Sequence, residues 1–238
     1  MLRGLPLSLL LALSPAAFAQ APPPPPPAPA SGSAPAPGPT SRPVALPSVT
    51  VPERSDAPVM TDGQFSPGEW DGAVRVALNE AVELLLRQHR GVVFLGIRGS
   101  GADTMVGPSG LFLSVPGGPI HLLHRSLQLG EVVLPAQGEA PPFRFGLTPD
   151  WYANEERRDE EAFKRLQGEG KTPFEIIRAT TYPTEGMEFA IRRSKLAGTR
   201  WLLHLEVSAM VGNRPDWIVF PQGTVDRNTD AWLELKLE

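Results

Sequence analysis

The stretch TDGQFSPGEWDGAVRVAL, residues 61–78, decides where the fold of this chain begins. Asp62-Gly63 and Pro67-Gly68 are turn dipeptides, because glycine reaches positive φ freely and proline presets its own φ. The indole of Trp70 follows, and apolar side chains then alternate along residues 74–78 in the pattern of a β-strand. The sequence therefore predicts that targeting and linker segments precede this stretch and that one β-rich domain follows it.

Residues 1–20 have the three regions of a secretory signal peptide. Arg3 supplies the positive charge, residues 5–13 form a short apolar run, and Ala17-Phe18-Ala19 forms a small-x-small cleavage site. The alternative is a membrane anchor, but a span needs about 20 apolar residues and this run is much shorter. We therefore expect cleavage and export to the periplasm or the extracellular medium, with no transmembrane span in the mature chain.

Residues 21–57 are rich in proline and alanine and include an unbroken proline run at 22–27. Such a segment has few donors for a β-ladder and too little apolar surface to offset the entropy of ordering, so we expect a disordered, extended linker. Tethering the domain away from a surface is the favoured role, and binding to a proline-recognising module is the alternative. The folded domain is expected to cover residues 58–238.

The bulk composition excludes several classes of function. A chain of 238 residues leaves about 180 for a core, which is one domain by the usual size range. A formal charge of −4 gives no long-range attraction to nucleic acid or to anionic lipid. Cysteine is absent, which excludes disulfides, thiolate metal sites and cysteine nucleophiles.

Short apolar or alternating runs, separated by glycine and proline, dominate the domain. We expect strands at 74–78, 81–86, 91–97, 111–115, 120–123, 131–134, 174–179, 186–191, 201–207, 217–220 and 232–237, with a loop at 99–110. Many short strands with such turns favour an antiparallel β-sandwich over alternating β-α units. Trp70 and Trp201 are expected in its core.

One segment, about residues 148–170, has the pattern of a helical insertion. Thr148 and Pro149 suit the N-cap and the first helical position, helix formers fill 154–167, and Gly168 marks the end. We expect this helix to lie on the sandwich. Shielding a sheet edge is its favoured role, and covering a site is the alternative.

Both ends of the domain resemble the carbohydrate-binding module family 9-like domains, which are related to DOMON domains. The resemblance is carried by Asp62-Gly63, Gly68-Glu69-Trp70, Ala73 and residues 93–98, and later by 187–191, 196–198, 217–221 and 231–235. It covers about residues 58–98 and 184–238, whereas 99–183 departs from the pattern. The resemblance implies an immunoglobulin-like or jelly-roll antiparallel β-sandwich, usually carried on exported bacterial proteins, that grips sugars between tryptophans and polar side chains.

The candidate ligand-binding residues are Trp151, Tyr152, Trp217 and Trp232. Aromatic faces pack on the apolar face of a sugar ring, which is the reason for choosing this residue type. Trp151 and Tyr152 open the expected insertion and are the preferred exposed platform, with anchoring of the insertion as their alternative role. Trp217 and Trp232 begin strands, and Trp232 is expected on the face opposite Leu233, either on the outer surface or under the insertion.

Several residues invite a metal or cofactor interpretation. His121 and His124 have a zinc-like spacing but no acidic third ligand before Glu131, and on a strand they would point to opposite faces, so surface or hydrogen-bonded histidines are expected. His204 is expected on a polar face. Calcium could be held by Asp103, Asp226 and Asp230, although aspartate-rich loops are more often turns. No bound metal and no cofactor are expected.

No catalytic signature is present, so we expect no enzyme. Ser66, Ser109 and Ser126 lack the Gly-x-Ser-x-Gly elbow of hydrolases. Three functions remain open: a binding module for a glycan or another envelope ligand, a structural or protein-interaction domain of the cell envelope, and a haem-binding electron-transfer domain. The haem alternative would draw its axial ligands from Met105, Met187, Met210, His121 and His124.

Overall fold

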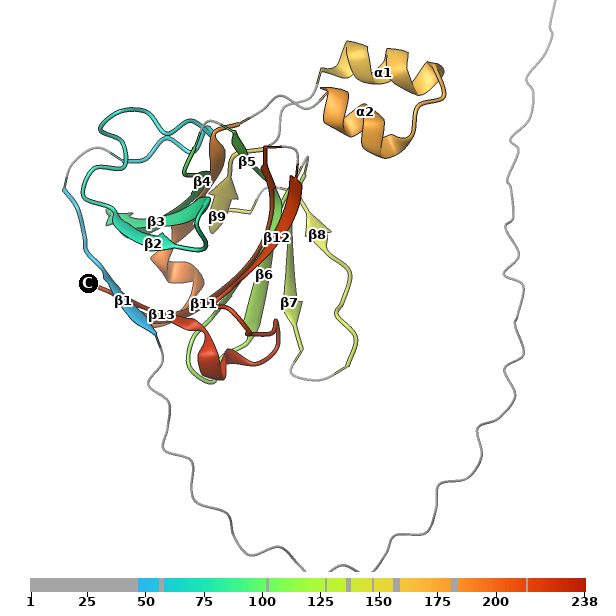
Figure 1. Ribbon diagram of the computed structural model, residues 1–238. Helices are drawn as coiled ribbons and strands as arrows, with labels where there is room; N and C mark the ends of the chain where they lie inside the picture. The colour runs from blue at the N-terminus through green and yellow to red at the C-terminus, as the bar shows by residue number, and fades with distance from the viewer. Residues whose placement is uncertain are drawn as a thin grey trace, which may run out of the picture. The chain divides into compact units, whose positions relative to one another are not determined.

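Two packed β-sheets form the body of the domain (Figure 1). The computed structural model describes residues 47–55, 58–101, 103–126, 128–135, 138–146, 148–155, 159–180, 184–212 and 214–238. The expected signal peptide and residues 21–46, 56 and 57 of the expected linker lie outside these ranges. Within them, no helix is both long and apolar enough to cross a membrane.

The larger sheet, sheet A, has eight strands. Their order is β1 (Ser48–Val51), β13 (Leu233–Leu237), β11 (Arg200–Val211), β5 (Thr104–Ser114), β6 (Ile120–Arg125), β7 (Leu129–Leu134) and β8 (Arg144–Phe145), with β12 (Arg214–Phe220) also paired to β11. Sheet B has the order β2 (Val74–Ala77), β3 (Val82–His89), β4 (Val92–Gly99), β10 (Gly186–Arg192) and β9 (Trp151–Ala153). Neighbouring strands run antiparallel, and the described exception is β1 with β13.

The main core lies between the two sheets and contains alternate residues of their strands. Leu84 and Leu86 of β3 belong to this layer together with Leu203 and Leu205 of β11, and all four are fully buried. Trp201 has the same parity and is also fully buried, as the sequence predicts. The prediction of a mainly β, antiparallel sandwich with a helical insertion is therefore confirmed.

Each sheet also buries apolar side chains on its outer face, the face turned away from the other sheet. On sheet B this outer layer contains Val59, Phe65, Trp70, Leu85 and Phe94. On sheet A it contains Phe112, Ile120, Val132, Leu134, Leu202 and Trp232. The segment before β2 supplies part of the layer on sheet B, and loop residues supply part of the layer on sheet A, so parts of both sheets are covered on both faces. This double burial explains why nearly every residue of β3 is buried, including the polar residues Arg87, Gln88 and His89.

The carboxylate of Glu188 in β10 holds the segment before β2 on sheet B. It accepts hydrogen bonds from the backbone N–H groups of Asp62 (3.0 Å) and Gly63 (2.8 Å) and from the indole of Trp70 (3.0 Å). Gly63 has φ +83°, and a Cβ there would lie 2.4 Å from Nδ2 of Asn154. The Asp62-Gly63 turn is thus required by both conformation and space.

Burial raises the pKa of Glu188 to about 7; the hydrogen bonds from Gly63, Trp70 and Asp62 oppose the shift and the nearby Glu69 adds to it. The carboxyl group is fully buried, so the charged form loses the hydration that it has in the unfolded chain.

Three sequence predictions about strands, loops and the linker are wrong. Residues 48–51, expected in the linker, form β1, because the β-branched residues of Ser-Val-Thr-Val pair with β13 and bury Val51 completely. Residues 104–110, expected in a loop, belong to β5. Residues 174–179, expected as a strand, belong to α2 (Pro173–Thr180).

The helical insertion starts later than predicted and has two helices. α1 (Glu160–Gly168) begins at the N-cap Asp159, whose side chain accepts from Ala162 N, and Thr148 is not a cap. At the start of α2, Thr172 Oγ1 accepts from Glu175 N while the Glu175 carboxylate accepts from Thr172 N, which is a capping box ahead of Pro173. α1 and α2 pack on each other, and Asp159 N donates to Thr180 O (2.7 Å).

The raised pKa of Glu188 predicts a specific pH dependence of stability. The folded state binds this proton more tightly than the unfolded chain, so its contribution is present below the ordinary value of 4.5 and is lost as pH rises toward about 7. In urea titrations, the unfolding free energy of the wild type should fall over this range relative to that of Glu188→Gln. The exposed Glu155→Gln control should follow the wild type, and parallel curves for wild type and Glu188→Gln would contradict the assignment.

Candidate functional site

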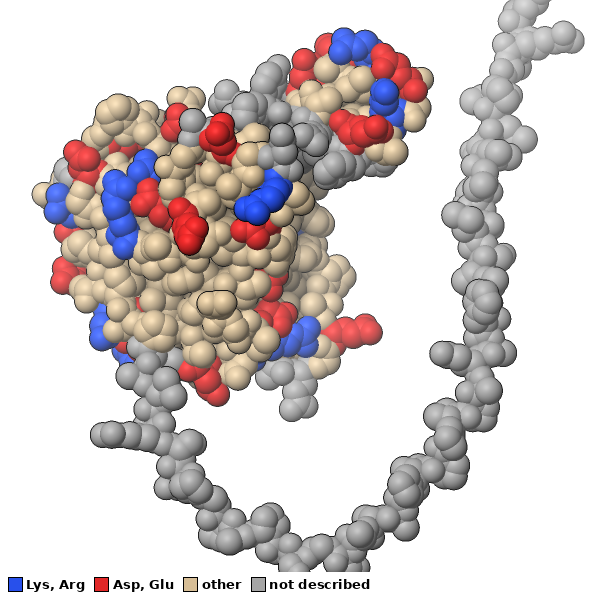
Figure 2. Space-filling model, in the orientation of Figure 1, with Lys and Arg blue, Asp and Glu red and all other residues tan. Residues whose placement is uncertain are grey.

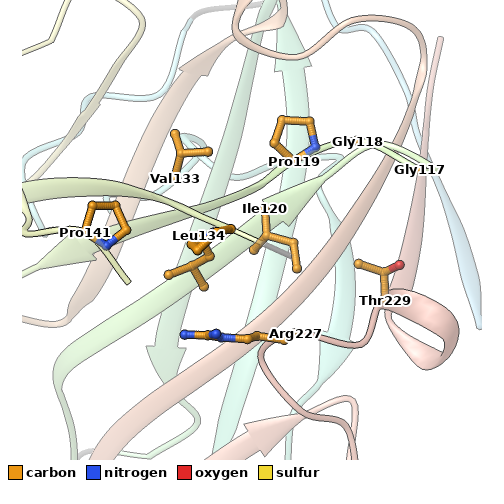
Figure 3. Close-up of a pocket in the computed structure, with 10 residues that line it drawn as sticks. Gly117, Gly118, Pro119, Ile120, Val133, Leu134, Pro141, Arg227 and Thr229 are labelled. Atoms are coloured by element: carbon orange, nitrogen blue, oxygen red, sulfur yellow. The ribbon is translucent and has the colours of Figure 1, made fainter. Parts of the chain in front are cut away.

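A pocket of about 670 Å³ opens where three connections meet at sheet A (Figure 3). It is lined by Gly117, Gly118, Pro119, Ile120, Val133, Leu134, Pro135, Pro141, Arg227 and Thr229. The lining residues come from the β5–β6 turn, the ends of β6 and β7, the β7–β8 connection and the β12–β13 connection. In the close-up, Ile120, Leu134 and Pro141 lie together, and the Arg227 side chain runs beside them.

The β5–β6 turn is fixed by a buried serine. Ser114 is fully buried, and its hydroxyl lies within hydrogen-bond distance of the carbonyls of Val115 (3.0 Å), Gly118 (3.2 Å) and Pro119 (3.0 Å). Gly117 has φ +71°, and Gly118 N donates to Val115 O (2.8 Å), which closes the turn. Pro-Gly-Gly-Pro at 116–119 therefore forms a rigid wall with two small residues, which leaves room for a ligand beside it.

The β12–β13 connection is held down by Trp232. Its indole stacks on His204 with centroids 5.3 Å apart and an interplanar angle of 19°, and its edge meets Phe112 at 6.3 Å. Trp232 Nε1 donates to Val225 O (3.0 Å), and Trp232 N donates to Thr229 O (3.3 Å). Trp232 thus lies on the side opposite Leu233, as predicted, but it is buried beneath this connection and is neither on the surface nor under the helical insertion.

His204 is fully buried beside Trp232, so its predicted place on a polar face is wrong. The ring is accommodated because its Nδ1 lies 2.8 Å from Thr224 Oγ1 and its faces contact aromatic rings. Burial lowers the pKa of His204, and the neighbouring Glu206 partly opposes the shift. A neutral imidazole is therefore favoured under Trp232.

The pocket offers one cation, one hydroxyl and an apolar floor. An Arg227 terminal nitrogen donates to Gly138 O (2.5 Å), which joins two of the connections and leaves other guanidinium donors for a ligand. Thr229 adds a hydroxyl on the same side (Figure 3). Such an arrangement suits a small ligand with an apolar face and an acidic or hydrogen-bonding edge. On the face of the molecule in Figure 2, acidic and basic residues are interspersed around a broad uncharged area.

The four predicted ligand-binding aromatics do not form one platform. Trp151 and Trp232 are buried, while Tyr152 and Trp217 are exposed by 42% and 58%. Tyr152 pairs with Ala190, which packs in the outer layer of sheet B, whereas Trp217 pairs with Ser208 on the outer face of sheet A. The two exposed rings lie on opposite sides of the sandwich. Trp151 is not the start of a helix, because β9 pairs with β10 and its indole stacks on Phe189 at 6.4 Å.

A buried ion-pair network joins β6, β7, β9 and the turn after β10. Glu131 accepts from Lys195 (2.6 Å) and Trp151 Nε1 (2.9 Å), and His121 Nδ1 lies 3.1 Å away. The Lys195 side chain is only 6% exposed. Burial alone would raise the pKa of Glu131, but the hydrogen bonds from His121, Lys195 and Trp151, with the Lys195 charge, lower it to about 2. His121 is thus hydrogen-bonded, as expected, and its partner is Glu131, the first acidic residue after the His-x-x-His pair.

The predicted calcium ligands form no cluster, and three of the predicted haem ligands, Met187, His121 and His124, lie apart. In the parts of the chain that the structure describes, no three His, Asp or Glu side chains come together in a way that could hold a metal ion, and this includes Asp103, Asp226 and Asp230. Met187 is in the main core, where it accepts from Ser109 Oγ (3.1 Å). His124, three residues after His121 on β6, points to the other face and meets Phe143 edge-on at 5.7 Å.

Sequence reasoning missed Arg227, Thr229 and the pocket itself. The available signal was the Pro-Gly-Gly-Pro turn and the clustered prolines around 135–141, which the strand pattern treated as punctuation. Comparison with known proteins adds no assignment, since no protein-family model, characterised protein or solved structure matches this chain.

The Glu131 network predicts a large effect of a small substitution. Glu131→Gln would leave the buried Lys195 ammonium without its carboxylate and should lower the unfolding free energy by about 3 kcal/mol in urea titrations. The matched control is Glu161→Gln, which breaks the exposed pair with Lys164 (3.3 Å) and should cost less than about 0.5 kcal/mol. Equal, small losses in both variants would show that the network contributes little.

Proposed function

We propose that this protein is an exported, non-catalytic binding domain whose ligand is a glycan or another cell-envelope component with an acidic group. The pocket bounded by Arg227 carries the proposal, because it combines an apolar floor with one guanidinium. The signal-peptide pattern and the proline-rich segment support export and a tethered domain in the periplasm or the medium.

The chemistry of the pocket suits an acidic sugar. Ile120, Leu134 and Pro141 supply a surface against which the C–H face of a sugar ring can pack. Arg227 can form paired hydrogen bonds to a carboxylate, and Thr229 can serve a ring hydroxyl. A volume of about 670 Å³ is within the range of small-ligand pockets. The family resemblance at both ends of the domain also favours a sugar ligand.

A protein-interaction role in the envelope is the second candidate, and a specific surface favours it. Trp217 is 58% exposed on β12, which pairs with β11. A large exposed indole on a strand is typical of contact surfaces between proteins. This surface is separate from the pocket residues, so the two candidates can be tested independently.

The test is a titration of the purified full-length protein with a glycan array that includes uronic-acid oligosaccharides, followed by intrinsic tryptophan fluorescence. Trp232 packs three residues from Thr229, so an occupied pocket should change the emission saturably. Arg227→Ala should weaken binding at least about tenfold, because a charge-assisted hydrogen bond is lost.

Arg165→Ala is the matched control, since Arg165 is an exposed arginine on α1. It should bind as the wild type does. Absence of binding to every glycan, or equal affinity of Arg227→Ala and wild type, would overturn the pocket assignment. If Arg227→Ala retains glycan binding and Trp217→Ala loses it, the binding site lies on the outer surface of β12 instead.

A further inference from the structure

Two methionines lie opposite each other on neighbouring strands of sheet A. Met105 of β5 and Met210 of β11 are direct partners in the antiparallel register. Their neighbours Val106 and Ala209 belong to the main core between the sheets. Since side chains alternate along a strand, both methionines project from the outer face. Met105 is 49% exposed, and Met210 is half-buried.

The register brings Trp217 to the same surface. Met210 pairs with Pro215 of β12, and Ser208 pairs with Trp217, so Trp217 is the diagonal neighbour of Met210 on the outer face. Diagonal neighbours lie about 7–8 Å apart, within reach of an aromatic side chain. Gly212 N donates to Asp103 O (2.8 Å), which ties the end of β11 to the start of β5 and fixes the two methionines in register.

This combination is chemically specific. Directly opposed residues have Cβ atoms about 5 Å apart, so two flexible thioether side chains can turn their sulfur atoms toward one shared ion. Thioether sulfur is a soft ligand that selects soft ions such as Cu(I), while the face of a tryptophan ring attracts a cation. The chain has no cysteine, so methionine sulfur is its softest donor.

We propose that Met105 and Met210 form a surface site for a soft monovalent metal ion, Cu(I) or its analogue Ag(I), with the Trp217 ring against the ion. The site is independent of the Arg227 pocket. Thioethers carry no proton, so binding releases none, unlike binding at cysteine or histidine.

The chain contains its own controls. Met60 is 65% exposed and, among the residues that the structure describes, no second methionine is paired with it, while Met187 is buried in the core. Leucine is close to methionine in volume, so Met→Leu substitutions remove the sulfur without disturbing the strands. Met105→Leu and Met210→Leu therefore test the ligands, and Met60→Leu tests non-specific binding to an exposed thioether.

The experiment is a calorimetric titration of the full-length protein with silver nitrate in chloride-free buffer, with NMR of the labelled methionine methyl groups. One Ag(I) should bind per chain, shift the methyl signals of Met105 and Met210, leave those of Met60 and Met187 in place, and quench Trp217. Met105→Leu and Met210→Leu should each weaken binding at least about tenfold, whereas Met60→Leu should not change it.

Two further outcomes decide the proposal. The affinity should stay constant between about pH 5 and pH 8, because a thioether does not titrate there whereas a histidine site would lose the ion in acid. Trp217→Phe should leave one ion bound but reduce the affinity, since the phenyl ring attracts a cation less strongly. No binding, equal binding by Met105→Leu and Met60→Leu, or a steep loss in acid would each overturn it.

Discussion

The arrangement of the domain depends on one buried carboxylate. Glu188 gathers the N–H groups of Asp62 and Gly63 and the indole of Trp70 onto β10, while its own N–H donates to the side chain of Asn154 (2.7 Å). The segment before β2 can cover sheet B only because these contacts replace the water that a buried acid would otherwise need. The outer layer around Phe65 and Phe94 follows from that anchoring.

On sheet A, the outer apolar face is covered through aromatic packing and not through a buried carboxylate. Trp232, His204 and Phe112 stack beneath the β12–β13 connection, and this packing places Arg227 and Thr229 at the rim of the pocket. Trp232 therefore supports the candidate site and does not form its contact surface. The pocket and the surface of Met105, Met210 and Trp217 are two separate places on sheet A.

The sequence predicted the strands where alternation reports burial on one face, as in residues 201–207, and it placed Trp70 and Trp201 in apolar layers. Prediction from the sequence failed where pairing with a strand distant in the chain determines the secondary structure. Residues 48–51 form a strand because they pair with β13, and Trp151 lies in a strand because β9 pairs with β10. The apolar residues of 174–179 have the pattern of a strand, but Thr172 and Glu175 have the spacing of a capping box, which indicates the start of a helix. Burial of His204 and the convergence at Arg227 require knowledge of the loop paths, which local patterns do not contain.

The parallel pairing of β1 with β13 has a mechanical consequence. A pull on Pro47 directed along β1 would load the ladder from Ser48 to Val51 in shear, because the hydrogen bonds to β13 run across that direction. The carbonyls of Pro47 and Val51 accept from Glu234 and Glu238, and the Gln88 side chain of sheet B also bonds to Val51. Tension is thus distributed at once over the C-terminal strand and both sheets. These contacts of β1 with β13 and with sheet B would have to break together before the N-terminal strand could detach from the domain.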